Sequence, residues 1–455
     1  MAGAISPQIR ILSTGEPRLL TDIGRVDPTS LASYREHGGY AALERAVTQL
    51  SPEDVIGEIE TAGLRGRGGS GYPTAAKWRA ARATGADRRI VVANLMAADP
   101  SALGDRALAE GNPHLVVEGL LVAAYAVGAA EAIIAVRRDW AEAIDRLRTA
   151  IREATDAHLA GYLVLGTDTS IQLSVWEGSG AYVAGEETAL LNALAGDRGM
   201  PAIRPPFPAH RGLHDAPTVV QNGETLAHAA WILAHSPEAF ASIGKDGNRG
   251  TKLVTVMGRV AQPGLVEVPL GTPLLDLLNL AGGGKGTTKA LFVGGPGGGA
   301  IDAGSLSTTY DYESLAAAGA IIGSGSVLVT DTDTCMVDTA RFFVDFSARE
   351  ACGKAVPCRI GTKRLVEALD RILAATPRPN DFTLLRELSR KVSDTALCRL
   401  EQLAPGPILT TLDRFPDEYR AHAERGECVA GYHPPLDVPP LLEPLPGIDA
   451  PARLE

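Results

Sequence analysis

The sequence predicts an α/β protein with a mostly parallel sheet, followed by a smaller β-rich module and a helical C-terminal region. Short β-branched runs alternate with helical patterns through the first half of the chain. Strands separated by a turn begin near residue 251, and long helical patterns dominate after residue 337. The 455 residues suggest about three domains, and a hydrophobic content of 45% is sufficient for several cores.

The strand–helix alternation is clearest between residues 89 and 194. We expect strands at residues 89–92, 132–136 and 171–175, and helices at residues 113–127, 140–154 and 186–194. Asn112 is placed to cap the first of these helices, and Pro113 suits its first turn. Parallel sheets bind ligands beyond the carboxyl ends of their strands, where Asn94 and residues 178–187 fall.

The second half of the chain has different patterns. Two strands around a turn are expected at residues 253–256 and 265–268, with a helix at residues 273–280. Longer helices are expected at residues 339–348, 363–375 and 381–392. The segment after Tyr432 is rich in proline, so it should be extended.

The most distinctive segment is residues 63–78, which read GLRGRGGSGYPTAAKW. Its glycines allow the backbone N–H groups to turn toward an anion, and Arg65, Arg67 and Lys77 would add positive charge. A phosphate-bearing ligand suits this pattern, and a flexible surface loop is the alternative. The segment matches neither a Walker A loop nor the dinucleotide fingerprint with its acidic partner.

A second glycine-rich turn, GSGAYVAGEETALL at residues 178–191, places Tyr182, Glu186 and Glu187 near the start of a predicted helix. From the residues alone, two interpretations stay open. The carboxylates can line a ligand site, or they can simply be favourable partners of the helix dipole.

Charge and cysteine content exclude several classes of protein. A net charge of −11 argues against nucleic acid as a partner. The longest apolar run is interrupted by Glu118 and Glu131, so no membrane span is expected. The N-terminus lacks the layout of a signal peptide. An odd number of cysteines, five, argues against a disulfide framework and favours the cytoplasm. The nine histidines form no ligand spacing and are expected to be ordinary residues.

From about Val26 to about Gly431, the chain resembles the flavoprotein subunit of respiratory complex I and the diaphorase subunits of NAD-linked hydrogenases and formate dehydrogenases. This resemblance implies a Rossmann-like flavin-binding domain, a β-grasp (soluble-ligand-binding) module and a C-terminal helical bundle. It also implies hydride exchange between NAD(P)H and FMN, then electron transfer to iron–sulfur partners. No side chain is expected to act as a general acid or base. The implied partners are a thioredoxin-like [2Fe–2S] subunit and a larger redox catalytic subunit.

The resemblance divides the chain into five parts. They are an N-terminal segment packing on the flavin domain (1–62), the FMN/NAD-binding domain (63–248), the β-grasp module (249–335), a helical iron–sulfur-type domain (336–431) and the proline-rich tail (432–455).

The resemblance also implies cofactor-binding residues. The matching positions are Gly66, Arg67, Gly68, Lys77, Asn94, Tyr182, Gly185, Glu186, Glu187 and Asn222, together with Tyr72, Asp99, Arg204 and Phe207. In the family pattern, Tyr72 and Phe207 belong to the adenine site, and the position of Asp99 faces the nicotinamide.

Several positions depart from the family pattern. Met96 and Ala97 replace two acidic residues of the flavin pocket, Asp99 replaces a glutamate, and Ala80 replaces an aromatic residue of the adenine site. A hydrogen bond to a charged group contributes roughly 1.5–3 kcal/mol, so these changes bear directly on cofactor binding. They leave a second hypothesis open, a degenerate paralogue that is a structural subunit or a flavoprotein without NADH oxidation.

The cluster motif departs as well. The family holds a [4Fe–4S] cluster with four cysteines, whereas this chain keeps Cys352, Cys358 and Cys398 and has Ala355 at the second ligand position. The open outcomes are no cluster, a three-iron cluster, or a four-iron cluster with one non-cysteine ligand. Buried free thiols are the structural alternative. Cys335 has no counterpart among the family's ligands.

Overall fold

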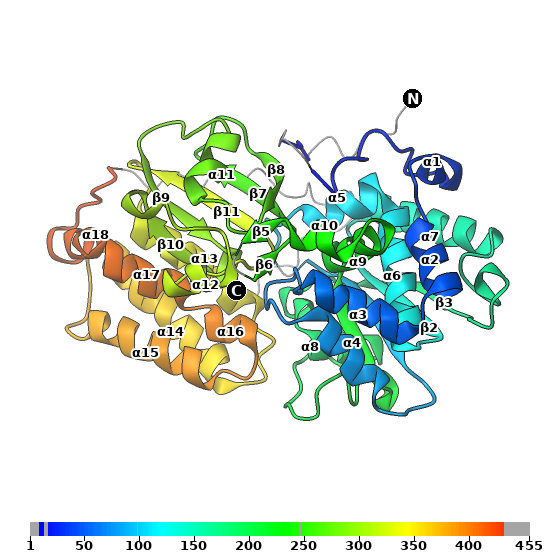
Figure 1. The fold of residues 1–455 in the computed structure, drawn as a ribbon. Helices are drawn as coiled ribbons and strands as arrows, with labels where there is room; N and C mark the ends of the chain where they lie inside the picture. The colour runs from blue at the N-terminus through cyan, green and yellow to red at the C-terminus, as the bar shows by residue number, and fades with distance from the viewer. Residues whose placement is uncertain (1–8, 13–16, 98, 246, 432–455) are drawn as a thin grey trace.

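The computed structural model describes residues 9–12, 17–97, 99–245 and 247–431. The parallel sheet and its helices lie on one side of the molecule, and the β-grasp module and the C-terminal helices lie on the other (Figure 1). This arrangement confirms the predicted fold class. The proline-rich tail, residues 432–455, lies outside the described residues.

A four-stranded parallel sheet forms the centre of the N-terminal half. Its strands, in spatial order, are β3 (Gln172–Gly178), β2 (Glu131–Arg137), β1 (Ile90–Leu95) and β4 (Thr218–Asn222). The chain runs from β1 outward to β2 and β3, then returns to place β4 on the other side of β1. The direction of winding therefore changes between β1 and β4. In open parallel sheets this switch point is where ligands bind.

Helices cover this sheet and confirm the predicted alternation. They are α5 (Gly104–Gly111), α6 (Pro113–Val127), α7 (Ala141–Asp156), α8 (Glu187–Leu194) and α9 (Gly223–Ala234). Helix α6 packs closely on α9, because a Cβ at Gly119 would lie 2.1 Å from the carbonyl oxygen of Leu226. Asn112 is the N-cap residue of α6, as expected, although its side chain makes no capping hydrogen bond.

The N-terminal helices α1 (Leu31–Glu36), α2 (Ala41–Gln49) and α3 (Pro52–Ala62) precede α4 (Thr74–Arg82). Helices α2 and α3 pack on α6 and α9. The buried carboxylate of Glu118 on α6 accepts hydrogen bonds from the Tyr34 hydroxyl (2.6 Å) and from the backbone N–H groups of Tyr40 (3.0 Å) and Leu43 (3.1 Å). The residue that interrupts the apolar run thus anchors the N-terminal segment, while burial raises its pKa.

The β-grasp module is a five-stranded sheet, larger than the two strands expected. Its spatial order is β10 (Gly299–Asp302), β9 (Thr288–Val293), β11 (Ser326–Asp331), β7 (Thr251–Gly258) and β8 (Gly264–Pro269), with helices α11 (Leu274–Leu280) and α12 (Tyr312–Ala317). Helix α10 (Pro237–Ala241) and the short strands β5 (Gly244–Lys245) and β6 (Asn248–Arg249) connect it to α9.

The C-terminal helices are α13 (Met336–Glu350), α14 (Val356–Leu373), α15 (Asp381–Thr395), α16 (Arg399–Leu403), α17 (Gly406–Arg414) and α18 (Pro416–Arg420), followed by one π-helical turn at Ala421–Arg425. The three long helices expected here are confirmed, and α14 begins earlier than expected because a proline lies in its first turn. Across the described part of the chain, the structure contains no helix with the length and apolarity of a membrane span.

A buried ion pair joins the two halves. Lys252 on β7 and Glu224 on α9 form it, with side chains 0% and 2% exposed. The Lys252 ammonium also donates to the carbonyl oxygens of Leu253 and Ser324, each at 3.0 Å. The second Glu224 oxygen accepts the backbone N–H of Leu253 at 2.8 Å. Because both charges are shielded from water, removing either one would leave the other buried without a counter-charge.

Removing one partner of this pair tests its role. We expect Lys252→Met to lower the free energy of unfolding by about 3–5 kcal/mol, since it leaves the Glu224 carboxylate buried and unpaired. In the double variant Lys252→Met, Glu224→Gln, most of the loss should be recovered, because the neutral amide still accepts the Leu253 N–H. Chemical denaturation measures both changes. Arg420→Ala, which breaks an exposed pair with Asp417, is the control and should cost less than about 1 kcal/mol. Wild-type stability in Lys252→Met would contradict this role.

Candidate functional site

Two asparagines lie side by side at the switch point of the sheet. Asn94 near the end of β1 and Asn222 at the end of β4 are register partners. The Asn94 amide lies 3.4 Å from the carbonyl oxygens of Ala184 and Gly185. The Asn222 Oδ1 accepts the backbone N–H of Thr225 (3.1 Å) and so caps α9. The parallel pairing of β1 and β4 thus places two amide side chains at one edge of the sheet.

The glycine-rich loop lies next to these asparagines. A Cβ built on Gly68 would sit 3.6 Å from the Cβ of Asn222. At Gly69, φ is +115° and the Cα faces the backbone of Gly323 in the β-grasp module, so a side chain there would be strained and crowded. The Tyr312 hydroxyl donates to the carbonyl oxygen of Gly66 at 2.8 Å. The loop is therefore fixed between the sheet and the β-grasp module.

The two arginines of the loop do not supply charge to a ligand as expected. Arg67 is 0% exposed, and its guanidinium donates to the carbonyl oxygens of Thr251 (2.9 Å), Arg65 (2.9 Å) and Arg249. The Arg65 guanidinium binds the Glu313 carboxylate at 2.7 Å. A buried guanidinium needs acceptors for its five N–H donors, and backbone carbonyls provide them here. Both side chains tie the loop to the β-grasp module and its preceding strands.

Lys77 is the cation of this segment that reaches the end of the sheet. Its ammonium lies 3.0 Å from Glu187 Oε2 and donates to the Val220 carbonyl oxygen at 3.2 Å. The other Glu187 oxygen lies 3.3 Å from the Arg204 guanidinium. All three side chains are only partly buried. Lys77, Glu187 and Arg204 therefore form one chain of alternating charges beside the sheet.

The neighbouring residues of the second glycine-rich turn have different positions. Glu186 is 8% exposed, and its carboxylate caps α8 by accepting the backbone N–H of Ala189 at 2.9 Å. This contact agrees with the interpretation in which the Glu186 carboxylate is a favourable partner of the helix dipole. Gly185, in the preceding 3₁₀ turn, offers its carbonyl oxygen to Asn94. Tyr182 is buried edge-on against Phe346 of α13 (5.3 Å between ring centroids), and burial raises its pKa well above the ordinary value.

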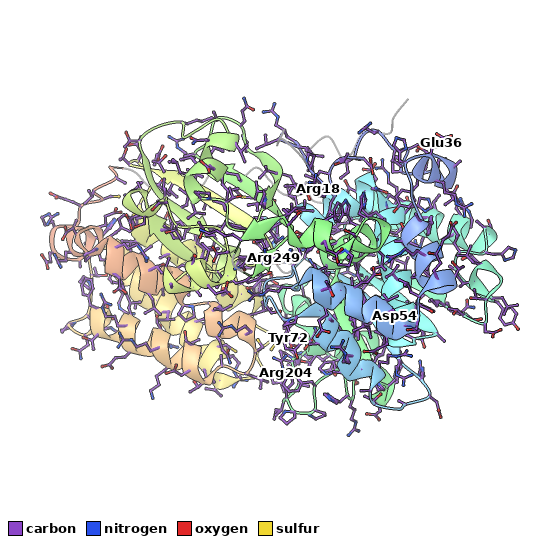
Figure 2. The ribbon with its side chains drawn as sticks, in the orientation of Figure 1. Arg18, Glu36, Asp54, Tyr72, Arg204 and Arg249 are labelled. Carbon is purple, nitrogen blue, oxygen red and sulfur yellow. The ribbon has the colours of Figure 1, made fainter. Side chains whose placement is uncertain are left out.

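Two large aromatic side chains near the loop are open to solvent. Tyr72 is 53% exposed and Phe207 is 51% exposed. The Arg204 guanidinium lies over the Phe207 ring, 5.9 Å from its centroid. Figure 2 labels Tyr72 and Arg204, which project from the N-terminal half toward the side where the C-terminal helices lie. Exposed aromatic rings beside a cation suit stacking with a planar base.

The segment after β1 does not present acidic groups to this site. Asp99 is 4% exposed, and its carboxylate binds the backbone N–H of Ser101 (2.9 Å) and the hydroxyl of Ser326 on β11. In this structure Asp99 is thus held by Ser101 and Ser326, and its place facing a nicotinamide stays a prediction. Met96 is 0% exposed within an apolar cluster. Ala97 is half-buried and has a φ of +42°.

Asp105 is a polar neighbour that sequence reasoning missed. One of its oxygens lies 3.4 Å from the Asn222 amide nitrogen and accepts the backbone N–H of Glu224 at 2.8 Å. Loss of solvation, reinforced by the Glu224 charge, raises its pKa from 3.8 to about 6. No local pattern distinguishes this aspartate from others near a helix start. Its contact with Asn222 in the folded structure identifies Asp105 as a neighbour of the site.

The three cysteines of the reduced cluster motif have different exposures. Cys358 and Cys398 are buried, whereas Cys352 is half-buried, and all three are free thiols. The Cys358 thiol donates to the carbonyl oxygen of Ala355 at 3.1 Å. The methyl side chain of Ala355 cannot bind iron. The three cysteines could bind three irons of a [4Fe–4S] cluster, and the fourth iron would require another ligand.

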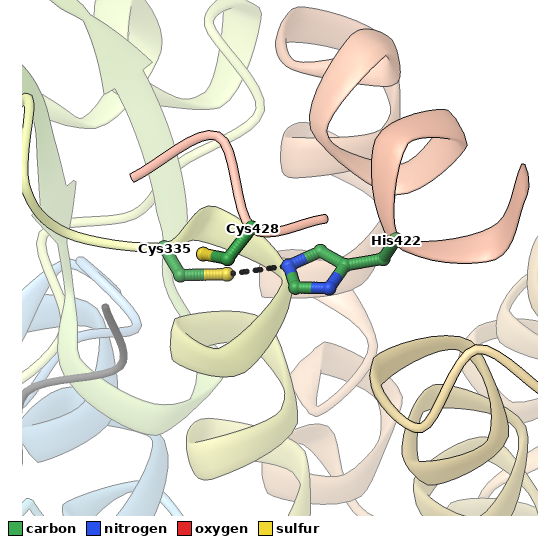
Figure 3. Close-up of side chains that lie close together, drawn as sticks. All are labelled: Cys335, His422 and Cys428. Atoms are coloured by element: carbon green, nitrogen blue, oxygen red, sulfur yellow. Dashed lines mark hydrogen bonds between the residues drawn. The ribbon is translucent and has the colours of Figure 1, made fainter. Parts of the chain in front are cut away.

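A further set of ligand atoms was missed because its members are far apart in sequence. Cys335, His422 and Cys428 place their ligand atoms within 4.8 Å of one another, with Cys335 Sγ 3.3 Å from His422 Nε2 (Figure 3). Burial raises the pKa of the Cys335 thiol to about 12. Thiolate and imidazole are ligands that zinc prefers. The spacing of the histidines in the sequence did not single out His422, which lies in this group.

Comparison with known proteins agrees with this architecture. Residues 59–231 match the Nuo51 FMN-binding domain, residues 253–299 the SLBB domain, and residues 338–422 the iron-sulfur binding region of NADH-ubiquinone oxidoreductase-F. The NADP-reducing hydrogenase subunit HndC of Solidesulfovibrio fructosivorans is 42% identical over 410 residues, which cover 90% of this chain and 83% of that protein.

Two further known proteins are similar to this chain. A subunit of the NADH-quinone oxidoreductase of Rhizobium meliloti (strain 1021) is 36% identical over 416 residues, covering 91% of this chain and 99% of that protein. A crystal structure of an NAD⁺-reducing [NiFe]-hydrogenase in the H₂-reduced state matches with a TM-score of 0.81 and 30% identity, over 92% of this chain and 68% of that one.

These findings define the class of protein as an oxidoreductase subunit with an FMN-binding domain. The chain belongs to the family of flavoprotein subunits of NADH-quinone oxidoreductases (complex I) and NAD(P)-linked hydrogenases.

The raised pKa of Asp105 predicts a pH dependence of stability. Its folded pKa is about 6 and its ordinary value is 3.8, so the folded state binds the proton more tightly than the unfolded state does. The stability this provides is complete below about pH 4 and is lost as the pH rises through 6. The Asp105→Asn variant has no titrating carboxyl group at this position, so it should not lose this stability as the pH rises. The difference in unfolding free energy between variant and wild type should grow by up to about 3 kcal/mol between pH 4 and pH 7, measured by denaturation. A difference that does not change with pH would contradict the shift.

Proposed function

We propose that this chain is the FMN-binding subunit of a multisubunit oxidoreductase, which exchanges hydride between NAD(P)H and FMN and passes electrons to iron–sulfur partners. The observation that carries the proposal is the pairing of Asn94 and Asn222 at the switch point, beside the glycine-rich loop and Lys77. Ligands of open parallel sheets bind at this place.

The residues present fit the phosphate of FMN. Gly66 and Gly68 carry no side chains, so a phosphate can approach the loop backbone closely at these two positions. Lys77 has three N–H donors, and the described contacts with Glu187 and Val220 use two of them. A phosphate oxygen would take the remaining donor. The loop is already fixed by Tyr312 and Arg67, so binding requires little ordering of the backbone.

The other expected site residues would orient the two cofactors. The amides of Asn94 and Asn222 would hold the polar edge of the flavin, and Tyr72 and Phe207 would stack on the adenine of the dinucleotide. Arg204 and Glu187 would line the entrance between them. Gly185, Glu186 and Tyr182 would shape the wall of the pocket from the second glycine-rich turn. When bound, FMN converts a two-electron hydride into single electrons, so no side chain needs to exchange a proton with substrate.

A second candidate function is a flavoprotein that does not oxidise NADH. The burial of Asp99 and Met96 favours it, since neither side chain faces the site. Glu187, a carboxylate beside the site, is already neutralised by Lys77 and Arg204. We regard NADH oxidation as the better supported function, because Tyr72 and Phe207 remain exposed beside Arg204.

The proposed surroundings of the chain follow from its family and its cysteines. We infer a thioredoxin-like [2Fe–2S] subunit and a larger redox catalytic subunit as partners. Among the described residues no disulfide joins the five cysteines, which is compatible with a reducing compartment such as the cytoplasm. The division at residues 62/63, 248/249, 335/336 and 431/432 remains our proposal. Separate apolar clusters in the N-terminal half, the β-grasp module and the helical region support the divisions near residues 248 and 335, whereas one cluster spans residues 62/63.

Fluorescence titration with FMN tests the binding site. We expect Lys77→Met to weaken FMN binding about 10- to 150-fold, because one charge-assisted hydrogen bond contributes roughly 1.5–3 kcal/mol. The control is Lys391→Met, which removes an exposed lysine of the C-terminal helices and should leave the affinity unchanged. NADH is then added without oxygen, and loss of the flavin absorbance band reports hydride transfer. Equal affinity in Lys77→Met and wild type would place the flavin elsewhere, and no FMN binding would contradict the proposed function.

A further inference from the structure

Glu401 is a buried carboxylate without a compensating charge among the described residues. It is 4% exposed, and its Oε2 has no hydrogen-bond partner in the described part of the chain. Burying an ionised carboxylate is costly unless it is paired or binds a metal. A buried carboxylate oxygen without a hydrogen-bond partner is therefore suited to binding a cation.

The position of Glu401 brings it to the cluster cysteines. Cys398 is the N-cap residue of α16, and Glu401 is the third residue of that helix. Side chains at these two positions face each other, as they do in a capping box. The backbone N–H of Glu401 also interacts with the Cys398 thiol. Burial first, and the Glu401 charge in addition, raise the pKa of the Cys358 and Cys398 thiols. The Glu401 carboxylate is therefore near enough to both thiols to interact with them electrostatically.

Ala355, at the position where the family has its second cluster cysteine, lies in the same region. Ala355 is the N-cap residue of α14, three residues before Cys358, and it packs against the small apolar cluster that contains Cys358. The chain therefore lacks a thiolate at the second ligand position and has an unpartnered acidic side chain beside the others. Both features concern a site that needs four ligands.

We propose that Glu401 supplies the fourth ligand, through a carboxylate oxygen, to a four-iron cluster held by Cys352, Cys358 and Cys398. The inference rests on the proposed function, in which electrons leave the flavin through iron–sulfur centres. Iron accepts carboxylate ligands as well as thiolates. Bound iron would also keep Glu401 ionised, which removes the penalty of its burial. The cluster would then have one iron with oxygen ligation and three with cysteine ligation.

Iron and sulfide analysis with Mössbauer spectroscopy tests this ligand set on protein purified without oxygen and enriched in ⁵⁷Fe. We expect four irons per wild-type chain, one of them spectroscopically distinct. Glu401→Ala should lose that iron and give the electron paramagnetic resonance signal of an oxidised three-iron cluster. The control Glu387→Ala removes an exposed carboxylate of α15 and should keep all four irons.

Two further variants keep the test decisive if Glu401→Ala folds poorly. In Ala355→Cys, the new thiolate should displace the carboxylate, so the distinct iron signal disappears while the iron content stays at four. Adding Glu401→Ala to Ala355→Cys should leave that all-cysteine cluster intact. The proposal is overturned by a wild-type chain with three irons or none, by four irons in Glu401→Ala alone, or by an unchanged spectrum in Ala355→Cys. Flavin bleaching by NADH in the same samples reports the proposed function separately.

Discussion

The glycine-rich loop is held at the end of the parallel sheet by buried charges that connect it to another part of the chain. The Arg67 guanidinium donates hydrogen bonds to the backbone carbonyl oxygens of Thr251 and Arg249, at the start of the β-grasp module. The Lys252–Glu224 ion pair joins β7 to α9. Glu224 in turn donates its backbone N–H to Asp105, which lies beside Asn222. The geometry of the cofactor site therefore depends on the β-grasp module, which acts here as a structural support.

Local patterns predicted much of the fold. Strands β1 and β2 and helices α6 and α7 were predicted within a few residues, because buried strands and apolar helices differ in length and composition. Helix α5 between β1 and α6 was not predicted. Strand β4 and helix α9 were not predicted, since β4 has only five residues and α9 lacks a clear polar face. The role of Glu118 was also missed. As part of an apolar run it looked like an interruption, and its partners Tyr34 and Tyr40 lie about 80 residues earlier in the chain.

The site was predicted in part for the same reason. Asn94, Asn222, Lys77 and Glu187 were identified from motifs, and the sheet brings them to one region. A motif cannot show whether a side chain faces a ligand or its own scaffold, so the scaffold contacts of Arg67 and Asp99 were not predicted. Nor can it bring together distant residues such as Cys335 and His422, or reveal that the Glu401 carboxylate is buried without a partner among the described residues.

These observations support the proposal of a flavoprotein that accepts hydride at the switch point and has Ala355 where the family has its second cluster cysteine. The central claim is that hydride passes from NADH to FMN at the switch point despite Met96 and Ala97. The most direct measurement is anaerobic stopped-flow absorbance of the FMN-loaded protein, mixed with NADH or with NADH deuterated at the transferred position. The account predicts rapid bleaching of the flavin band, slowed by deuterium. A flavin that dithionite reduces but NADH leaves unchanged would contradict it.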